Sequence, residues 1–320
     1  MVADIGVQRY GWTMPTTVIR SLAPEAIASF EQAVGVARSA IDAGIYDPVR
    51  ARVADLLGVH DPVPADAASA ERCAAVADWP TSPLFGDADR AVMAFTEQYI
   101  VDVAAVTDDQ RSALTGALGD RSATFSQALY TIDYDLRVRA ALRQLFGQDL
   151  THHAAAQGEL WPTLEVMLVA IAKLHRLDPM TTELVRLRGA RVHNCRFCKS
   201  VRNVRAADQA GHESFFDQVD RYATSDLTDA QKTALRLTDA IYFSPAHFPD
   251  GLVTAIHQHF EPAQVMEIVL DIARNALNKS AVALGADGAG VGPDLHYYDT
   301  TPSGELVYGL TPSAQRGGPA

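Results

Sequence analysis

Along most of the chain, hydrophobic residues recur at the spacing of amphipathic helices, whereas convincing alternation of period two is rare. The apolar side chains of residues 24–43 fall mostly on one face of a helix, and residues 161–174 show the same period with a wider apolar face. Because strands alternate every second residue and helices repeat about every 3.6 residues, the pattern predicts an all-α protein.

Polar residues and prolines mark several predicted helix starts. Asp47 and Asp178 each precede a proline, and we interpret each pair as an N-cap with proline in the first helical turn. Capping boxes that open further helices are predicted at Thr107 with Gln110 and at Thr228 with Gln231.

These landmarks recur in the same order in the two halves of the chain, which favours an internal duplication. A predicted helix begins at Asp47 in the first half and at Asp178 in the second, and each is predicted to end at a glycine, Gly58 or Gly189. Amphipathic helices share a period by nature, so single matches arise by chance. Several landmarks in one order make duplication the better interpretation.

We therefore expect three parts. Residues 18–150 are predicted to form a degenerate repeat, residues 151–290 a repeat that carries a Cys-x-x-Cys motif, and residues 291–320 a C-terminal extension. In the extension, residues 295–299 and 305–309 flank a Thr-Thr-Pro-Ser-Gly segment and predict a small hairpin. We expect this hairpin to serve packing rather than function.

Charge and hydropathy narrow the classes of partner. The 39 acidic side chains outnumber the 27 Lys and Arg, and this acidic excess argues against nucleic-acid binding, which needs a basic face. The first residues show no secretory signal pattern. The most apolar stretches, residues 164–171 and 265–273, fall short of the roughly 18 residues that span a bilayer. We expect a cytoplasmic protein with no nucleic-acid or membrane partner.

Two of the three cysteines stand close together, at Cys195 and Cys198. Asn194 is a favoured N-cap, and the apolar positions that follow predict one helix over about residues 195–210. The spacing of three places both sulfurs on one side of that helix, close enough for a disulfide after a modest adjustment. The third cysteine, Cys73, has no nearby thiol and is expected to be a bystander.

Positive charge surrounds this pair in the sequence, at Arg196, Lys199 and Arg202. The positive end of a helix also stabilises a thiolate at its first turn. The sequence therefore predicts at least one thiol whose pKa lies below that of free cysteine.

Three interpretations of the pair compete. A zinc site requires four ligands, and the motif with His193 offers at most three among cations that disfavour a dication. A thioredoxin-like site would follow a strand, whereas helices are predicted on both sides here. Two structural cysteines at a helix start are about as plausible as a redox pair when the motif is considered without Glu183.

With Glu183, the segment resembles the AhpD-like superfamily, which includes alkylhydroperoxidase D and carboxymuconolactone decarboxylase. The peroxidase branch carries Glu, eleven residues, Cys-x-x-Cys, three residues and His; this chain has Glu183, eleven residues, Cys195 and Cys198, three residues and Arg202. The resemblance is close from about residue 178 to 211 and loose elsewhere. It implies an all-α, AhpD-like multihelical fold that is internally duplicated.

The resemblance also implies roles for these residues. Cys198 would be oxidised by an organic hydroperoxide to a sulfenic acid, Cys195 would resolve it to a disulfide, and Glu183 would belong to the proton relay. No bound cofactor is implied; a protein dithiol or lipoyl reductant would restore the thiols. Arg202 replaces the relay histidine and cannot shuttle a proton at neutral pH. His193 is the nearby candidate to replace it, although a capping role suits it better.

Two other functions remain open at this stage. The protein can be a catalytically weak or non-enzymatic redox-sensing or scaffold member of the family. It can also resemble carboxymuconolactone decarboxylase, although that branch does not depend on a Cys-x-x-Cys pair. Members of the superfamily commonly form oligomers, and residues 262–284 are apolar on almost every face of the predicted helix. We therefore expect a homo-oligomer; the alternative is that this helix is buried inside the subunit.

Overall fold

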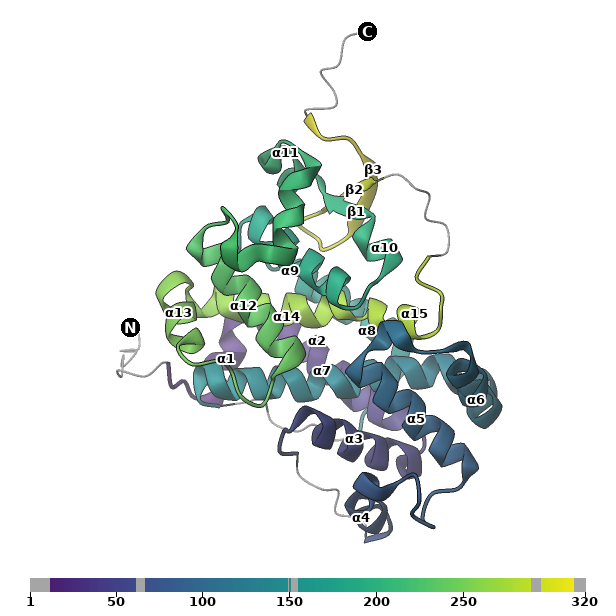
Figure 1. Cartoon of the computed structure of the whole chain (residues 1–320). Helices are drawn as coiled ribbons and strands as arrows, with labels where there is room; N and C mark the ends of the chain where they lie inside the picture. Colours follow the sequence, from purple (N-terminus) through teal and green to yellow (C-terminus); the bar gives the residue numbers. More distant parts are fainter. Residues whose placement is uncertain (1–11, 62–66, 149, 151–154, 289–294, 314–320) are drawn as a thin grey trace.

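The computed structural model describes residues 12–61, 67–148, 150, 155–288 and 295–313. Most of these residues are helical, and the strands among them form one small sheet of three (Figure 1). The predicted all-α class is confirmed, with this sheet as a minor addition. The predicted boundaries at residues 151 and 291 lie outside the described residues.

The first half is built of helices around one long central helix, α7, which crosses the middle of the molecule in Figure 1. Its helices are α1 (Thr16–Leu22), α2 (Pro24–Ala40), α3 (Ala43–Leu57), α4 (Ala67–Ala74), α5 (Asp87–Val101), α6 (Asp108–Leu118) and α7 (Ser122–Phe146).

The second half is also helical and contains the thiol motif between α9 and α11. Its helices are α8 (Leu160–Ala172), α9 (Pro179–Val192), α10 (Arg196–Lys199), α11 (Val204–Ala210), α12 (Asp229–Phe243), α13 (Leu252–His259), α14 (Pro262–Ala276) and α15 (Asn278–Ala283). A 3₁₀ segment, Glu213–Thr224, joins α11 to the loop before α12.

One hydrophobic core runs through both halves. Helix α2 packs against α7 and α8, and α7 packs in turn against α12, α14 and α15. Large side chains such as Phe30, Phe125 and Tyr134 are almost fully buried along these contacts. Because α7 packs against α14 and α15, these two helices of the second half rest on a rigid, close-packed base.

A buried ion cluster strengthens this base. Asp133 of α7 accepts hydrogen bonds from Lys279 Nζ of α15 at 2.8 Å and from Arg137 Nε at 2.6 Å. Arg137 also donates to the carbonyl oxygens of Ile241 and Tyr242 at the end of α12. The Asp133 carboxylate and the Arg137 guanidinium therefore connect three helices. Both groups are buried, and each is neutralised by a charged partner inside the protein.

The predicted helix starts are confirmed at three places and wrong at one. Asp178 caps α9, and the capping boxes of α6 and α12 are present as expected. Asp47 does not cap a helix: α3 already begins at Ala43, because Asp42 accepts the hydrogen bond of Gly44 N at 2.7 Å. Pro48 consequently lies inside α3.

The two glycines paired in the predicted duplication do different things. Gly58 ends α3 with φ of 66°, a left-handed conformation that glycine adopts without strain. Gly189 lies inside α9, where a Cβ atom would come within 2.3 Å of the Tyr242 hydroxyl oxygen. The prediction that Gly189 ends a helix is wrong, since its role is to let α12 approach α9.

The predicted C-terminal hairpin is present. Strand β2 (His296–Thr300) pairs antiparallel with β3 (Leu306–Leu310), with Tyr298 opposite Tyr308. The unexpected strand β1 (Val201–Asn203) runs parallel to β2. The sheet thereby carries the C-terminal hairpin directly onto the segment that follows Cys198 (Figure 1).

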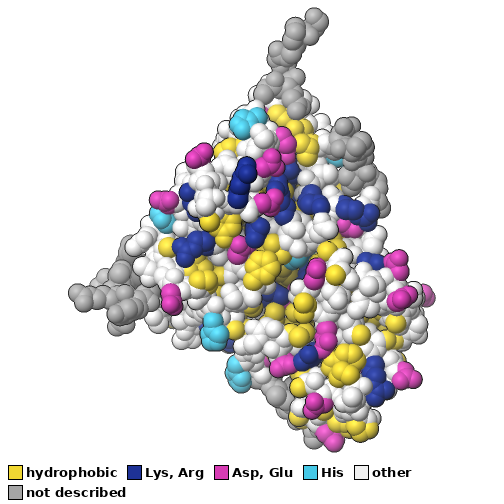
Figure 2. Space-filling model, in the orientation of Figure 1, with side chains coloured by type: hydrophobic (Ala, Val, Ile, Leu, Met, Phe, Trp, Pro, Cys, Tyr) yellow, Lys and Arg dark blue, Asp and Glu magenta, His cyan; other side chains and the backbone are white. Residues whose placement is uncertain are grey.

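The apolar helix expected to serve assembly is buried within the subunit. Val265, Ile268, Val269 and Ile272 of α14 have no more than 1% of their surface exposed. Their hydrophobicity is thus explained inside one chain, and a homo-oligomer stays a prediction that light scattering can test. On the face in Figure 2, acidic and basic side chains are interspersed. Every helix in the described part is too short or too polar to cross a membrane.

Candidate functional site

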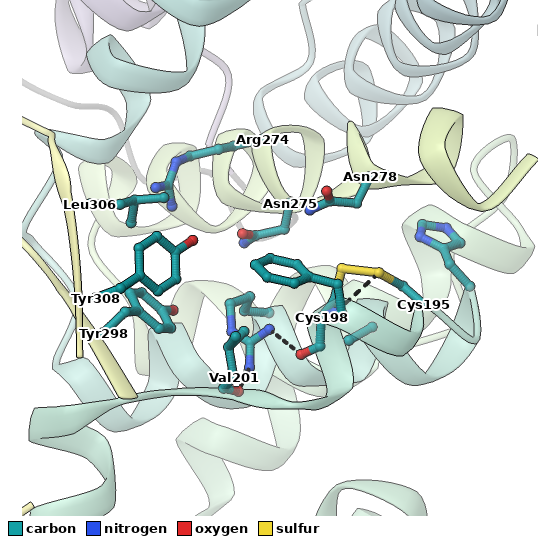
Figure 3. Close-up of a pocket in the computed structure, with 13 residues that line it drawn as sticks. Cys195, Cys198, Val201, Arg274, Asn275, Asn278, Tyr298, Leu306 and Tyr308 are labelled. Carbon is teal, nitrogen blue, oxygen red and sulfur yellow. Dashed lines mark hydrogen bonds between the residues drawn. A yellow bond between two sulfur atoms is a disulfide. The ribbon is translucent and has the colours of Figure 1, made fainter. Parts of the chain in front are cut away.

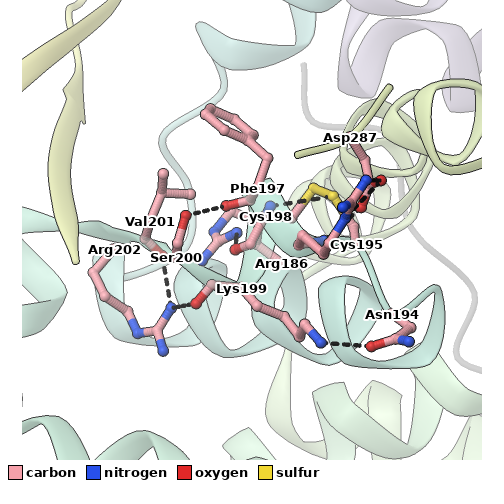
Figure 4. Close-up of a disulfide and its surroundings, with 11 residues drawn as sticks. Arg186, Asn194, Cys195, Phe197, Cys198, Lys199, Ser200, Val201, Arg202 and Asp287 are labelled. Atoms are coloured by element: carbon pink, nitrogen blue, oxygen red, sulfur yellow. Dashed lines mark hydrogen bonds and ion pairs between the residues drawn. A yellow bond between two sulfur atoms is a disulfide. The ribbon is translucent and has the colours of Figure 1, made fainter. Parts of the chain in front are cut away.

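Cys195 and Cys198 form a disulfide at the start of α10 (Figure 4). Their Cα atoms are 5.3 Å apart, within the usual range of about 4.4–6.8 Å for this bond. Only 2% of Cys195 and 6% of Cys198 is exposed. The amide of Cys198 donates a hydrogen bond of 3.1 Å to Cys195 Sγ, which would stabilise a Cys195 thiolate after reduction.

The helix predicted over residues 195–210 is broken, so that prediction is wrong. Asn194 is not its N-cap but lies in the left-handed region at φ 50°, and Cys195 caps the short helix α10 instead. The chain then extends into β1 before α11 begins. Arg186 explains the break, because its guanidinium binds the carbonyl oxygens of Cys198 at 2.8 Å and Val201 at 2.8 Å, which a continuous helix would use internally.

The three cations near the motif in sequence are engaged elsewhere. Arg196 binds Asp287 through its side chain and its backbone amide, and Lys199 donates to the side-chain oxygen of Asn194. Arg202 pairs with Glu213 at 2.6 Å. The expected cationic surroundings of the thiols are therefore not supplied by these three residues.

Arg202 is turned away from the disulfide (Figure 4). Its Nη1 donates to the carbonyl oxygens of Lys199 and Val201, and its guanidinium lies over the ring of Phe216. Burial lowers the pKa of Arg202, although the neighbouring Glu213 opposes this effect. Arg202 thus fixes the loop after the motif.

Glu183 is buried, with 1% of its surface exposed, and forms a two-bond ion pair with Arg186 at 2.8 and 2.6 Å. Arg186 is buried as well, with 7% of its surface exposed. Tyr298 of β2 donates its hydroxyl to Glu183 Oε2 at 3.0 Å. Glu183 therefore touches the thiol motif through Arg186 and reaches the hairpin through Tyr298.

A small cavity of about 70 Å³ adjoins the disulfide. Both cysteines line it on one side, and the hairpin residues Tyr298 and Tyr308 line it on the other (Figure 3). His193 and Phe197 also line it. The hairpin that we expected to serve packing alone thus forms a wall of the candidate site. Tyr298 was missed, because a tyrosine about one hundred residues from the motif carries no spacing signal.

His193 lies in this cavity wall with 8% of its surface exposed. Burial, reinforced by the charge of Lys279, lowers the pKa of His193 to about 3, so the imidazole is neutral at pH 7. Its Nε2 lies 3.5 Å from the hydroxyl oxygen of Tyr134. A neutral imidazole of this kind can pass a proton between neighbours but holds one poorly by itself.

A cation that the sequence did not indicate faces the same cavity. Arg274, at the end of α14, lines it together with Asn275 and Asn278 (Figure 3). Arg274 Nε donates to Leu168 O at 3.2 Å, and its two Nη atoms have no hydrogen-bond or ion-pair partner among the described residues. Arg186 and Arg274 are the two arginines that line this cavity, and Arg186 is already paired with Glu183.

A third feature lies behind Glu183, where a cavity of about 390 Å³ is lined by Asp271, Glu267 and Arg274. Burial raises the pKa of Asp271 to about 8, and Glu267 adds to this rise while Arg274 opposes it. Asp271 is therefore largely protonated at neutral pH. No group of three or more metal-binding side chains occurs within the described ranges.

This shift predicts a pH dependence of stability. Between about pH 4 and 8 the folded Asp271 holds a proton that the unfolded chain has released, so its contribution to stability falls as pH rises. The free energy of unfolding of Asp271→Asn, relative to that of the wild type, is expected to rise progressively from pH 5 to pH 8 in urea unfolding. The exposed Asp250→Asn is the control, and parallel behaviour of the two variants would contradict the prediction.

Two proteins of Mycobacterium tuberculosis are similar to this chain. They are named uncharacterized protein MT2376, from strain CDC 1551 / Oshkosh, and uncharacterized protein Rv2313c, from strain ATCC 25618 / H37Rv. Each is 38% identical to the chain over 247 residues, which cover 74% of this chain and 85% of the relative. No family model and no solved structure matches the chain. The chain belongs to the same family as these two mycobacterial proteins.

Proposed function

We propose that the protein is an AhpD-like, thiol-dependent peroxidase that reduces organic hydroperoxides through the Cys195 and Cys198 pair. The proposal includes the duplicated organisation, with a degenerate repeat at residues 18–150, the thiol repeat at residues 151–290 and an extension that closes the site. The observation that carries it is that the disulfide lines a cavity together with Arg274, which has no ion-pair partner among the described residues. A purely structural disulfide needs neither the cavity nor the cation.

The reaction proceeds in two steps. The Cys198 thiolate attacks the outer oxygen of the hydroperoxide, the O–O bond breaks, and Cys198 becomes a sulfenic acid while the alkoxide takes up a proton to give the alcohol. Cys195 then attacks the sulfenic sulfur, a disulfide forms and water leaves. Cys198 is the more exposed of the two sulfur residues, and the Cys198 amide hydrogen bond favours Cys195 as a thiolate.

Glu183, Tyr298 and Arg274 support this chemistry from three sides. Burial, together with the charge of Glu183, raises the pKa of Tyr298, so its hydroxyl stays protonated between Glu183 and the cavity. The hydroxyl proton lies in the bond to Glu183, so it passes to a leaving oxygen when the hydroxyl turns toward the cavity, and the proton that the Cys198 thiol releases on ionisation restores it. Arg274 supplies the positive charge that the segment around the motif lacks.

The cycle requires an external dithiol or lipoyl-type reductant, since the chain offers no further thiol near the pair; Cys73 lies in the other half. We place the reaction in the cytoplasm, where disulfides are usually transient and redox-active. Such a location fits a disulfide that opens and closes rather than one that stabilises permanently.

The direct test is stoichiometric. The reduced protein is mixed with cumene hydroperoxide, and remaining thiols and cumyl alcohol are measured over time. The proposal predicts one alcohol and one disulfide per chain, followed by turnover when a dithiol reductant is added. Intact reduced thiols that survive an excess of hydroperoxide would refute it.

A redox-sensing protein is the second candidate, and the burial of both sulfurs favours it. A disulfide with 2% and 6% exposure reacts slowly with a bulky reductant, which suits a switch better than a fast catalyst. The same stoichiometric experiment separates the two, because a sensor forms the disulfide once but shows no sustained turnover.

A further inference from the structure

An apolar groove of about 680 Å³ adjoins the disulfide cavity, a volume typical of small-molecule sites, which span about 300–1,000 Å³. Its walls are formed by helices α7, α8, α14 and α15, by Phe197 of α10 and by the hairpin. Its apolar walls include Trp161, Leu168, Val169, Leu277, Ala281 and Leu284.

The exposed part of this groove is unusually apolar for a surface. Trp161 is 46% exposed and Leu306 of the hairpin is 44% exposed, although both are large hydrophobic side chains. An apolar ligand that covers them would remove this surface from water, at a gain of roughly 25 cal/mol for each Å². The walls therefore favour a ligand with a hydrocarbon body.

The inner end of the groove is polar and positive. Arg274, Asn275 and Asn278 line both the groove and the disulfide cavity. The carboxamides of Asn275 and Asn278 and the two Nη atoms of Arg274 have no hydrogen-bond partner among the described residues. The carboxyl of Asp271, in the neighbouring cavity, is kept protonated by burial and so does not neutralise Arg274.

The acidic side chains that line the groove lie at its solvent-exposed rim. Glu165 and Glu305 line the groove and are exposed to solvent, where Glu165 accepts a hydrogen bond from Trp161 Nε1 at 2.9 Å. An anion is therefore favoured at Arg274 and disfavoured at the rim. One guanidinium without a second cation matches a singly charged carboxylate, which it can bind through two parallel hydrogen bonds.

We propose that this groove binds an amphipathic organic carboxylate, with its carboxylate on Arg274 and its hydrocarbon chain along α8 and α15. Asn275 and Asn278 would donate their amide hydrogens to the same carboxylate. The inference goes beyond the proposed peroxidase reaction, because binding needs neither thiol chemistry nor a reductant. It is measured on the oxidised full-length chain.

The experiment compares three probes by isothermal titration calorimetry: octanoate, 1-octanol and acetate. Octanoate is expected to bind at least about tenfold more tightly than 1-octanol, which lacks the charge, and than acetate, which lacks the chain. Equal affinities for octanoate and 1-octanol, or no octanoate binding at millimolar concentration, would overturn the proposal.

Variants locate the site. Arg274→Gln is expected to weaken octanoate binding about ten- to hundredfold and to leave 1-octanol unchanged, whereas Arg274→Lys retains part of the affinity. Ala281→Trp fills the groove and weakens both ligands. Arg205→Gln removes a cation outside the groove, 60% of whose side chain is exposed, and is the control. Unchanged octanoate binding in folded Arg274→Gln and Ala281→Trp would place the ligand elsewhere.

Discussion

Replacing Cys198 by serine is expected to reduce peroxidase turnover on the order of a thousandfold or more, because the serine hydroxyl does not form a sulfenic acid. The substitution leaves Cys195 as a lone buried thiol beside the cavity, without the partner that closes the disulfide. The measurement is the steady-state consumption of cumene hydroperoxide with a dithiol reductant, together with the mass of the oxidised protein.

Two further cysteine variants make this result specific. Cys195→Ser is expected to stop turnover as well, but to accumulate a sulfenic acid on Cys198 that dimedone labels. Cys73→Ser is the matched control, because Cys73 is also buried yet lies in the cavity between α3 and α4, away from the disulfide. Full activity in Cys198→Ser would exclude the role assigned to Cys198. Dimedone labelling confined to Cys195 would show that the roles of the two cysteines are reversed.

The sequence predicted those parts of the site that local spacing encodes. The disulfide between Cys195 and Cys198 follows from a spacing of three residues and is present. The start of α9 follows from Asp178 and the proline after it, and this start sets the position of Glu183 one turn later. These predictions succeeded because each depends on residues within one or two helical turns.

The electrostatics of the site could not be predicted in the same way. Arg196 and Lys199 stand beside the thiols in sequence, yet Arg196 pairs with Asp287, which is 91 residues away. Arg274 stands 76 residues beyond Cys198, and no local pattern connects it to the motif. Tertiary packing decides the side-chain partners, so the sequence could not show that the cations beside the motif are engaged elsewhere or that Arg274 lines the cavity.

The hairpin shows a second limit of sequence analysis. Its existence was predicted from two short segments around a turn, but β1 was expected to be helical, so the parallel pairing that places the hairpin over the site could not be foreseen. Arg186 explains the difference, because it takes the carbonyl oxygens that a helix after Cys198 would have used. One buried arginine thus redirects the chain and brings Tyr298 to Glu183.

Glu183→Gln is expected to destabilise the protein by about 3–5 kcal/mol, because it leaves the buried charge of Arg186 without its counterion. The double variant Glu183→Gln with Arg186→Met removes both charges but also leaves the carbonyl oxygens of Cys198 and Val201 without their donor, so it is expected to recover only part of this loss. Glu25→Gln is the matched control: its ion pair with Lys173 is exposed, and surface pairs contribute about 0–1 kcal/mol.

The measurement is urea unfolding of the oxidised protein at pH 7, followed by circular dichroism. It separates two roles of Glu183, since a residue that only relays protons would change turnover without changing stability. Tyr298→Phe tests the other contact of the carboxylate and is expected to cost about 1 kcal/mol, the usual contribution of one hydrogen bond. If Glu183→Gln unfolds at the same urea concentration as Glu25→Gln, the ion pair with Arg186 does not hold the thiol motif in place, and the break after α10 needs another cause.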